Sequence, residues 1–375
     1  MGTMNTMLDL FDIQIKDKRL KSPIAIASMA GITNAEYIKN RAKWIGLACI
    51  GGYSIDERTI EASHALVKKA REEFLFPNQE SALDSIEAQI KELADSEVVV
   101  CVNLRASSAE SLVIAAHRLG ADIIYEIDAH CRQEEMIQAG CGEHLLTHTD
   151  ILSQYISTLK AEGVLVSVKI RTGVAEDDTA LAHLIWKAGA DIIHIDCMDE
   201  GAKAVKIIRN ACPLFIIGNN SISSFESAKE MLTYGADLIS LARMSHSNVL
   251  SDLFNDMVQY AKETGWYNVP KQLCRGGDIR ALAFCCPPVK PCPLIPYLKE
   301  IGLSPQEFID MKTAGAGLPL MEGEGTCFGT LIFCCKLSTP CFARDLALRR
   351  ASMSKATFMK EKRALADKLL SMLFT

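Results

Sequence analysis

Eight cysteines lie close together in the last third of the chain and repeat one pattern. The segments 274–292 and 327–341 each contain a leading cysteine, an adjacent Cys-Cys pair, and a final cysteine that follows a proline. Four thiolates per segment are enough for one [4Fe–4S] cluster or one tetrahedral zinc ion. Adjacent cysteines normally point apart, so the pairing of ligands stays open. The expected metal ligands are Cys274, Cys285, Cys286, Cys292, Cys327, Cys334, Cys335 and Cys341.

Cationic and amide side chains form a second set, at the ends of short apolar runs. Lys169 and Arg171 lie at the end of the run 164–170, Asn103 ends the run 98–103, and His194 lies within the run 192–196. Lysine and amide groups can contact the polar edge of a flavin ring, and backbone N–H groups with a cation can hold its phosphate. These residue types therefore predict a site for flavin mononucleotide (FMN).

Such a site needs a scaffold that brings strand ends together. Between Ile24 and about Arg243, short β-branched runs alternate with segments of helical period, which is the pattern of repeated βα units. The expected strands span residues 23–27, 47–51, 98–103, 123–128, 164–170, 192–196, 215–218 and 238–242. Eight strands favour a closed (β/α)8 TIM barrel over an open doubly wound sheet. The C-terminal strand ends of a barrel share one mouth, and catalysis takes place there.

The sequence predicts two domains. Residues 1–262 form the flavin-binding barrel, and residues 263–375 form a cysteine-rich, iron–sulfur-type domain with a basic C-terminal helix. The stretch from Cys274 to Cys341 has only weak periodicity and many prolines and glycines, so we expect metal rather than an apolar core to hold it. The stretch from Arg344 to Leu373 contains eight Lys or Arg residues and three Asp or Glu residues. It therefore has a charge of about +5, and the rest of the chain has about −11, which together give the net charge of −6.

Composition excludes several classes of protein. A chain of 375 residues with 49% apolar content is not disordered throughout. A net charge of −6 argues against a protein that coats nucleic acid, so a nucleic-acid partner is not favoured. No apolar run approaches the length of a membrane span and no secretory signal is present, so we expect a cytoplasmic protein without membrane contact. In a reducing cytosol, fourteen cysteines favour metal ligation or catalysis over disulfides.

Motifs of the barrel region resemble those of the tRNA-dihydrouridine synthases. They are ASMAGITN from Ala27, IDAHCRQEEMIQAGCGEHLL from Ile127, VKIRTG from Val168, GNNSI from Gly218 and LAR from Leu241, in the family's order. The resemblance covers about Pro23 to His246, and the dihydroorotate dehydrogenases are a more distant similarity. It implies a flavin barrel in which hydride goes to one carbon of a C=C bond and a thiol protonates the other.

The resemblance and the strand ends together assign roles to individual residues. Cys131 is expected to donate the proton, and Lys169 and His194 are expected to contact the flavin and act in catalysis. The expected flavin-site residues also include Ser28, Met29, Ala30, Asn103, Arg171, Gly218, Asn219, Asn220, Ala242 and Arg243. Plainer interpretations stay open: strand-end salt bridges for Lys169 and Arg171, a buried core histidine for His194, and a small buried cysteine, like those elsewhere in the barrel, for Cys131.

The loop around Cys131 departs from the family pattern. The family's Asn-x-Gly-Cys-Pro is here Asp128-Ala129-His130-Cys131-Arg132, its strand-three Gln is Asn103, and its last phosphate-loop Gly is Ala242. An Asp in place of Asn replaces an amide donor by an acceptor-only anion, which argues against a uracil substrate. His130 and Arg132 could instead lower the pKa of Cys131 and make it a thiolate nucleophile or a metal ligand.

The cysteine-rich segment resembles a second family, the methanogenesis marker nine domain of methanogenic archaea. The strings RGGD at Arg275 and CCPPVKPCP at Cys285, with the later cysteines at Cys334, carry this resemblance. It covers about Cys274 to Cys341 and implies a role near methane metabolism without naming a reaction.

The favoured function is a flavin- and iron–sulfur-dependent oxidoreductase, linked to methanogen metabolism, that acts on an activated C=C bond or a cofactor precursor. Its expected partners are an electron donor such as a ferredoxin, and a small-molecule substrate or a methanogenesis enzyme. Iron–sulfur is favoured over structural zinc or free thiols, because a flavin barrel can use an electron relay. Two alternatives stay open: a tRNA-dihydrouridine synthase, and a non-enzymatic, cluster-carrying assembly factor on a degenerate barrel.

Overall fold

The chain divides into two compact units. The computed structural model describes residues 2–289, 291–337 and 340–374. The first unit comprises residues 1–231 and 236–255, and the second comprises residues 232–235 and 256–375. We call the second the cysteine-rich unit. The domain boundary expected after residue 262 lies within a helix of the structure, α12 (Ser247–Thr264).

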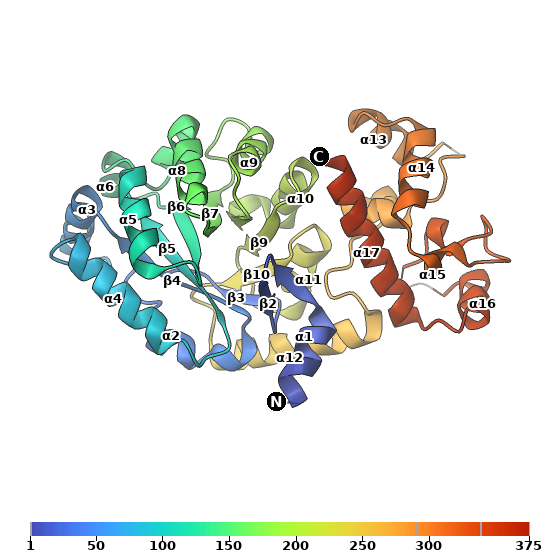
Figure 1. Ribbon diagram of the computed structural model, residues 1–375, viewed down its shortest axis with the longest axis horizontal. Coiled ribbons are helices and arrows are strands. Elements are labelled where there is room, and N and C mark those ends of the chain that lie inside the picture. The colour runs from blue at the N-terminus through green and yellow to red at the C-terminus, as the bar shows by residue number, and fades with distance from the viewer. Residues whose placement is uncertain (1, 290, 338–339, 375) are drawn as a thin grey trace. The chain divides into compact units, whose positions relative to one another are not determined.

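Eight parallel strands of the first unit close into a barrel, as the sequence predicts. The strands are β3 (Ile24–Ile26), β4 (Leu47–Ser54), β5 (Val99–Arg105), β6 (Ile124–Ala129), β7 (Leu165–Arg171), β8 (Ile192–Asp196), β9 (Phe215–Asn219) and β10 (Leu238–Leu241). Their order around the barrel follows the chain, and β10 closes it by pairing with β3. The (β/α)8 TIM-barrel prediction is therefore confirmed. Figure 1 shows these strands inside a ring of helices.

Helices follow the strands of the barrel, and capping residues fix where several of them begin and end. They are α2 (Ala35–Lys39), α3 (Glu57–Lys68), α4 (Gln79–Glu92), α5 (Ala109–Leu119), α6 (Glu134–Gln138), α7 (His144–Thr147), α8 (Thr149–Ala161), α9 (Asp178–Lys187), α10 (Ala202–Ala211), α11 (Phe225–Thr233) and α12. Asp56 and Thr59 form a reciprocal capping box at the start of α3. Gly120, at φ +82°, ends α5 in a conformation that other residues rarely adopt.

A helix and a hairpin precede the barrel, and the sequence reasoning did not predict them. They are α1 (Gly2–Phe11) and the antiparallel pair β1 (Ile13–Ile15) and β2 (Lys18–Leu20). Ile13, Ile15 and Leu20 are buried. The hairpin runs directly into β3, so it lies at the N-terminal end of the barrel, opposite the mouth. The mouth is thus left to the loops that follow the strands.

The cysteine-rich unit is built from short helices. They are η3 (Leu273–Arg275), η4 (Ile279–Phe284), α13 (Leu294–Glu300), α14 (Pro305–Gly315), α15 (Leu318–Met321), η5 (Leu331–Phe333), α16 (Phe342–Arg350) and α17 (Lys355–Leu373), where η denotes a 3-10 helix. No helix among the described residues is both long and apolar enough to cross a membrane.

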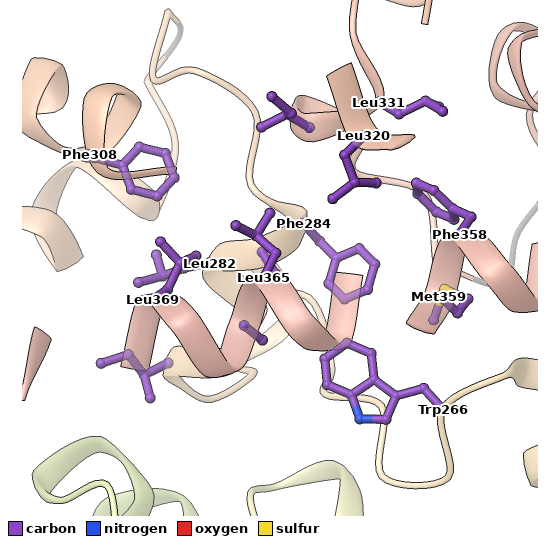
Figure 2. Close-up of a cluster of buried hydrophobic side chains, with 14 of the residues drawn as sticks. Trp266, Leu282, Phe284, Phe308, Leu320, Leu331, Phe358, Met359, Leu365 and Leu369 are labelled. Atoms are coloured by element: carbon purple, nitrogen blue, oxygen red, sulfur yellow. The ribbon is translucent and has the colours of Figure 1, made fainter. Parts of the chain in front are cut away.

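This unit has an apolar core of its own, which corrects the expectation that metal alone would hold it. Phe284 packs among Trp266, Phe358 and Leu365, and Figure 2 shows these side chains converging from separate elements. The sequence reasoning missed the core because its members come from η4, η5 and the apolar stripe of α17, which lie far apart in the chain. A metal centre in this unit is therefore not needed simply to bury apolar surface.

Candidate active site

The barrel interior is unusually polar for this fold. TIM barrels normally fill their centre with layers of Val, Ile and Leu side chains contributed by alternate strands. Here Cys49 of β4, Glu126 of β6, His194 of β8 and Ser240 of β10 are all buried, and their hydrogen bonds join them across the centre. The chain therefore places titratable groups directly beneath the mouth.

Glu126 and His194 form a buried ion pair. The carboxylate oxygen Oε2 lies 2.8 Å from His194 Nδ1, and the other ring nitrogen lies 2.7 Å from Ser240 Oγ. Burial opposes the charge on His194, but the adjacent carboxylate outweighs it and raises the histidine pKa to about 9. Burial likewise opposes the charge on Glu126, but His194 and further donors lower the pKa of Glu126 to about 2. Both groups are charged at neutral pH.

The ion pair does not support the expected flavin contact of His194. Both ring nitrogens already have partners, and the side chain is fully buried. Asp196, two residues further along β8, ends the strand instead. Because successive inward-facing residues are two positions apart, His194 lies one layer below the strand end. The plainer interpretation, a buried core histidine, fits the structure.

The same network brings together three side chains that resemble metal ligands. Within the described residues, Cys49, Glu126 and His194 are the one group of three His, Cys, Asp or Glu ligand atoms that lie within 4.8 Å of one another. Their direct contacts, 2.8 Å between Glu126 and His194 and 4.0 Å between Cys49 and Glu126, are those of a hydrogen-bonded network. Asn103 and Ser167 also donate to the Glu126 carboxylate. The network is satisfied by protein groups.

Lys169 is buried two residues before the end of β7, and its side chain reaches the loop after β3 at the mouth. Its ammonium group donates to the hydroxyl of Ser28 at 3.0 Å and is near the backbone oxygen of that residue at 3.4 Å. Ser28, Met29 and Ala30 follow β3, so the interaction joins two strand ends across the barrel. A buried lysine here can hold an acceptor edge of a ligand.

Asn103 offers a complementary group. Its amide nitrogen donates to Glu126 at 2.8 Å, whereas its buried side-chain oxygen has no hydrogen-bond partner. A Cβ added at Gly52 would lie 2.9 Å from that oxygen, so a larger residue there would press against it. A flavin ring edge carries an N–H donor beside carbonyl acceptors, and the Asn103 oxygen with the Lys169 ammonium matches that pattern. These residues fit the ring of FMN.

The expected phosphate side fits less completely. Asn219 donates its amide to Ser240, and the Asn220 amide donates to the backbone of Met198. Gly218 is close-packed, because a Cβ there would lie 2.5 Å from Met231 Cγ. Ala242 is half-buried and Arg243 exposed in the loop after β10. Of the predicted phosphate group, the structure therefore leaves Arg243 and the loop backbone in a position to meet an anion.

Arg105 connects the mouth to the loop after α3. Its guanidinium contacts Glu73 at 2.6 Å and Asp128 at 3.2 Å, and all three side chains are less than 10% exposed. A Cβ on Gly31 would lie 2.7 Å from the backbone nitrogen of Glu73, so this loop lies against the loop after β3. The segment that carries Glu73 thus covers part of the mouth near β3 to β5.

Asp128 has a structural role that the sequence reasoning did not foresee. One carboxylate oxygen accepts the backbone N–H groups of His130 and Cys131, each at 3.0 Å, and the other accepts from Arg105. Burial opposes the charge, but Arg105 and nearby cations lower the pKa of Asp128. The carboxylate therefore fixes the turn that carries Cys131 and is not free to contact a base.

Cys131 is a buried thiol. Its side chain packs with Ala62 and Leu66 of α3 and with Met136 of α6. Burial raises the pKa of the thiol, and Arg105 only partly offsets this effect. The structure therefore argues against the alternative in which neighbouring cations make Cys131 a thiolate. A thiol that stays protonated at neutral pH suits a proton donor better than a nucleophile.

Four titratable side chains cluster at the mouth beside Cys131. His130 Nε2 lies 2.9 Å from Asp196 Oδ2 and 3.1 Å from Arg171 Nη2, and Arg171 also contacts Glu143 at 3.3 Å. Burial lowers the pKa of His130, although Asp196 opposes this shift. Arg171 is thus engaged in a strand-end salt bridge, the plainer of its expected roles. The sequence reasoning missed Glu143, because nothing in its local spacing marks a partner on β7.

The eight cysteines of the cysteine-rich unit include two Cys-Cys pairs, Cys285-Cys286 and Cys334-Cys335. All fourteen cysteines of the chain are free of disulfides. Lys312 donates to the backbone oxygen of Cys285 and lies 5.4 Å from the ring centroid of Phe333, the residue before Cys334, so both pairs lie near one lysine. Within the described residues, no three of the eight sulfurs meet the 4.8 Å spacing of a single ion. A cluster spreads its ligands over several metal atoms and needs a wider spacing than one ion.

Two open hollows lie away from these groups. One, of about 630 Å³, is lined by residues of α8 and α9 such as His183, and the other, of about 650 Å³, lies near Lys160 and Asp191 at the N-terminal ends of the strands. Neither contains a residue of the mouth. Their size alone therefore does not make them the active site.

Comparisons with known proteins identify relatives of this chain. One uncharacterized protein of Methanocaldococcus jannaschii is 33% identical over 60% of this chain and 90% of its own length. A second uncharacterized protein of the same organism is 46% identical over 28% of this chain and 69% of its own length. The tRNA-dihydrouridine synthase B of Vibrio cholerae is 24% identical over 62% of this chain and 70% of its own length. That of Pasteurella multocida is 31% identical over 34% of this chain and 42% of its own length.

A solved structure and a family profile agree with the barrel assignment. The crystal structure of DHODH from Eimeria tenella in complex with ferulenol matches with a TM-score of 0.53 and 14% identity over 68% of this chain and 85% of that one, which shows a shared fold. The resemblance to the methanogenesis marker nine domain is not confirmed by these comparisons and stays a prediction. The profile of the family described as Dihydrouridine synthase (Dus) matches residues 75–267, just over half of the chain. The chain belongs to the dihydrouridine synthase (Dus) family.

Proposed function

We propose that this chain is a flavin-dependent oxidoreductase that reduces an activated carbon–carbon double bond. The observation that carries the proposal is a donor and an acceptor beneath the mouth: the Lys169 ammonium and the buried, unpaired side-chain oxygen of Asn103. Family membership and relatives named tRNA-dihydrouridine synthase support it. Bound FMN would supply hydride chemistry that no amino-acid side chain provides.

The chain's own residues would hold the ring and manage a proton. Lys169 stabilises negative charge on an acceptor edge, and Asn103 accepts a hydrogen bond from a ring N–H. Arg243 and the backbone after β9 and β10 meet the phosphate. Cys131 holds a proton on its thiol at neutral pH, and His130 with Asp196 lies beside it at the mouth. The proposed donor is Cys131, because burial keeps its proton in place while burial removes the proton of His130.

The cysteine-rich unit would supply electrons. Eight thiols in two repeated segments provide enough ligands for an iron–sulfur centre, and such a centre carries one electron at a time. A soluble electron carrier of the ferredoxin class would reduce it. A role near methane metabolism rests on the sequence resemblance alone and has no further support.

A uracil base in tRNA is the second candidate substrate. The sequence reasoning argued against it because Asp128 replaces an amide, but that carboxylate is occupied by its own turn and by Arg105. The objection therefore loses its physical basis. A small unsaturated metabolite remains the first candidate, because the whole chain has a net charge of −6 and offers no general attraction to phosphate.

Flavin binding is the decisive test. Anaerobically purified full-length protein should bind FMN, and Lys169→Met should weaken the affinity by tenfold or more. Lys187→Met is the matched control, because Lys187 is an exposed lysine over Trp186 on α9. Circular dichroism would check that each variant folds, and Asn103→Leu would provide a second change at the ring edge. If the wild-type protein binds no FMN, the proposal is wrong and the barrel is better regarded as a docking scaffold.

The substrate candidates need a separate assay. Reduced enzyme would be incubated with unmodified tRNA transcripts, and dihydrouridine would be measured by mass spectrometry. Cys131→Ala should lose turnover while FMN binding is retained, whereas His130→Gln should retain most of the turnover. Dihydrouridine formation would establish the second candidate, and its absence from an enzyme whose flavin is reducible would favour the first.

A further inference from the structure

Two lysines of the cysteine-rich unit are completely buried. Lys312 on α14 and Lys362 on α17 both have 0% exposure. Lys312 donates to the backbone oxygens of Leu282 and Cys285, and Lys362 donates to those of Ala283 and Ile332. Within the described part of the chain, neither ammonium forms an ion pair with a carboxylate. Carbonyl oxygens satisfy the N–H groups, but a buried charge also needs a counter-charge.

The two lysines occupy equivalent positions of a tandem repeat. In each copy a Cys-Cys-x4-Pro-Cys segment leads to a short helix, a serine follows, and a phenylalanine and a lysine come four and eight residues after that serine. The equivalent residues are Ser304, Phe308 and Lys312 in the first copy and Ser354, Phe358 and Lys362 in the second. The repeat therefore extends well beyond the cysteines.

The backbone repeats together with the sequence. The 3-10 helices η4 and η5 each end at a phenylalanine, and the next residue, Cys285 or Cys334, donates its N–H three residues back at 3.1 Å. Ser304 and Ser354 each cap the following long helix through the side-chain oxygen. The two copies thus present their Cys-Cys pairs in the same local geometry.

The copies also exchange contacts. Lys312 lies 5.4 Å from the ring centroids of both Phe308, in its own copy, and Phe333, in the other. Lys362 lies 5.5 Å from Phe358 and 5.6 Å from Phe284 in the same alternating way. Each lysine is therefore held by one ring from each copy. The arrangement brings the two Cys-Cys pairs to a common pair of positive charges.

We infer that Lys312 and Lys362 carry the counter-charge of a single anionic, four-thiolate metal centre that is shared between the two copies. A [4Fe–4S] cluster with four thiolates has a net charge of about −2, as does a zinc ion with four thiolates. Two ammonium groups balance one such centre but not two. The inference rests on the metal-binding part of the proposed function and goes beyond it: the ligands come from both Cys-Cys pairs, and the lysines are positioning residues.

The inference separates two roles that the lysines could have. If they only fasten the two loops through hydrogen bonds, replacing them destabilises the chain with or without metal. If they balance the charge of a thiolate centre, an apolar replacement relieves the metal-free chain of an uncompensated charge but weakens the metal-bound chain. The sign of the change in stability, measured for the metal-free and the metal-bound chain, therefore distinguishes the two roles of the lysines.

The experiment uses the full-length protein, purified without oxygen and reconstituted with iron and sulfide. Lys312→Met, Lys362→Met and the double variant are compared with Lys299→Met, which changes an exposed lysine on α13 of the same unit. The readouts are iron and sulfide per chain, the rate of iron loss to a chelator, the midpoint potential followed by EPR, and urea unfolding of the metal-free form.

We expect about four irons per chain in the wild-type protein, which corresponds to one [4Fe–4S] cluster. Each buried-lysine variant should lose iron at least tenfold faster than Lys299→Met and have a lower midpoint potential, because removing a positive charge disfavours the more negative reduced form. The metal-free variants should be no less stable than the metal-free wild type. Eight irons per chain, or variants that keep iron and potential like the control, would overturn the inference.

Failure of the inference can be told apart from failure of the proposed function. A protein that binds FMN but no metal after reconstitution refutes the shared centre and leaves the flavin site intact. One zinc ion per chain, held with the same dependence on Lys312 and Lys362, supports the counter-charge and refutes the electron relay. A lysine-dependent iron centre in a protein without FMN supports the inference and refutes the flavin function.

Discussion

The barrel and the cysteine-rich unit bury charge in different ways. In the barrel, Glu126 meets His194, and Arg105 meets both Glu73 and Asp128. In the cysteine-rich unit, two buried lysines meet carbonyl oxygens and aromatic rings, and within the described residues no carboxylate pairs with them. These barrel charges balance one another. Lys312 and Lys362 have no carboxylate partner among the described residues, although Arg280 and Asp278 form a buried ion pair elsewhere in the same unit.

If a metal centre supplies the proposed counter-charge, this difference predicts which unit gains more stability from its added group. A buried pair keeps its balance whether or not a ligand is bound, so the barrel should fold the same way with and without flavin. An unbalanced buried cation becomes favourable only when an anion arrives. Metal binding should therefore stabilise the cysteine-rich unit much more than flavin binding stabilises the barrel.

The largest expected effect comes from breaking the balance inside the barrel. Glu126→Leu leaves the His194 imidazolium buried without its partner and should lower the free energy of unfolding by about 3–5 kcal/mol. Urea denaturation at pH 7 would measure this. The double variant with His194→Leu should regain part of the loss, because it removes both charges. A loss below about 1 kcal/mol for the single variant would contradict the ion-pair assignment.

The pH dependence of stability gives the next effect. The pKa of His194 is raised from 6.5 to about 9, so its contribution is fully present below pH 6.5 and is lost as the pH rises through 9. Over this window the barrel should lose roughly 3 kcal/mol, at up to about 1.4 kcal/mol per pH unit. Urea midpoints between pH 6.5 and 9.5 would show the decline. The double variant without Glu126 and His194 should lack it.

The acid side of the same pair has the opposite sign. The pKa of Glu126 is lowered from 4.5 to about 2, so its contribution is present above pH 4.5 and is lost as the pH falls through 2. The wild-type protein should therefore have its greatest barrel stability between about pH 4.5 and 6.5, as far as this pair decides it. A stability that keeps rising from pH 6.5 to 9 would show that other groups outweigh the pair.

The strands were predictable because their signal is local. The run Ile192–Asp196 was located to the residue from its β-branched composition, and the other strands to within a few residues. The layer of a side chain was not predictable. His194 and Asp196 both face inward, and Asp196 is nearer the mouth because it lies further along the strand. Which residues of the other strands share its layer depends on the stagger of the closed barrel, and no local pattern encodes that stagger.

Partners distant in sequence also escaped prediction. Arg105 is 32 residues from Glu73 and 23 from Asp128, and Glu126 is 68 from His194. Such spacings have no meaning until the fold is known. The repeat in the cysteine-rich unit is a different case: its Ser, Phe and Lys positions are visible in the sequence, but a one-residue change of offset after the cysteines hides them. Only the structure shows that Lys312 and Lys362 are buried and do not lie on the surface.

Metal removal should sharpen the comparison by acting on one unit alone. Stripping the metal from the anaerobic protein leaves Lys312 and Lys362 without their counter-charge, which should destabilise the cysteine-rich unit by roughly 1–3 kcal/mol. The apolar core around Phe284 should keep the unit folded. Hydrogen exchange resolved by peptide would show faster exchange in α14 and α17 and no change in the barrel helices. Complete unfolding of the unit would mean that its core is weaker than its burial suggests.

The smallest expected effect concerns charges that are not buried. Lys39 and Glu92 form a surface pair with a 2.9 Å contact, and both side chains are more than 40% exposed. Lys39→Ala should change the free energy of unfolding by only roughly 0.2–1 kcal/mol, and 1 M salt should remove most of that difference, because water and ions already screen the pair. The Glu126→Leu effect should keep its size in the same salt. If both variants responded equally to salt, solvent would have to reach the Glu126–His194 pair, and the contrast between the paired charges of the barrel and the buried lysines of the cysteine-rich unit would lose its physical basis.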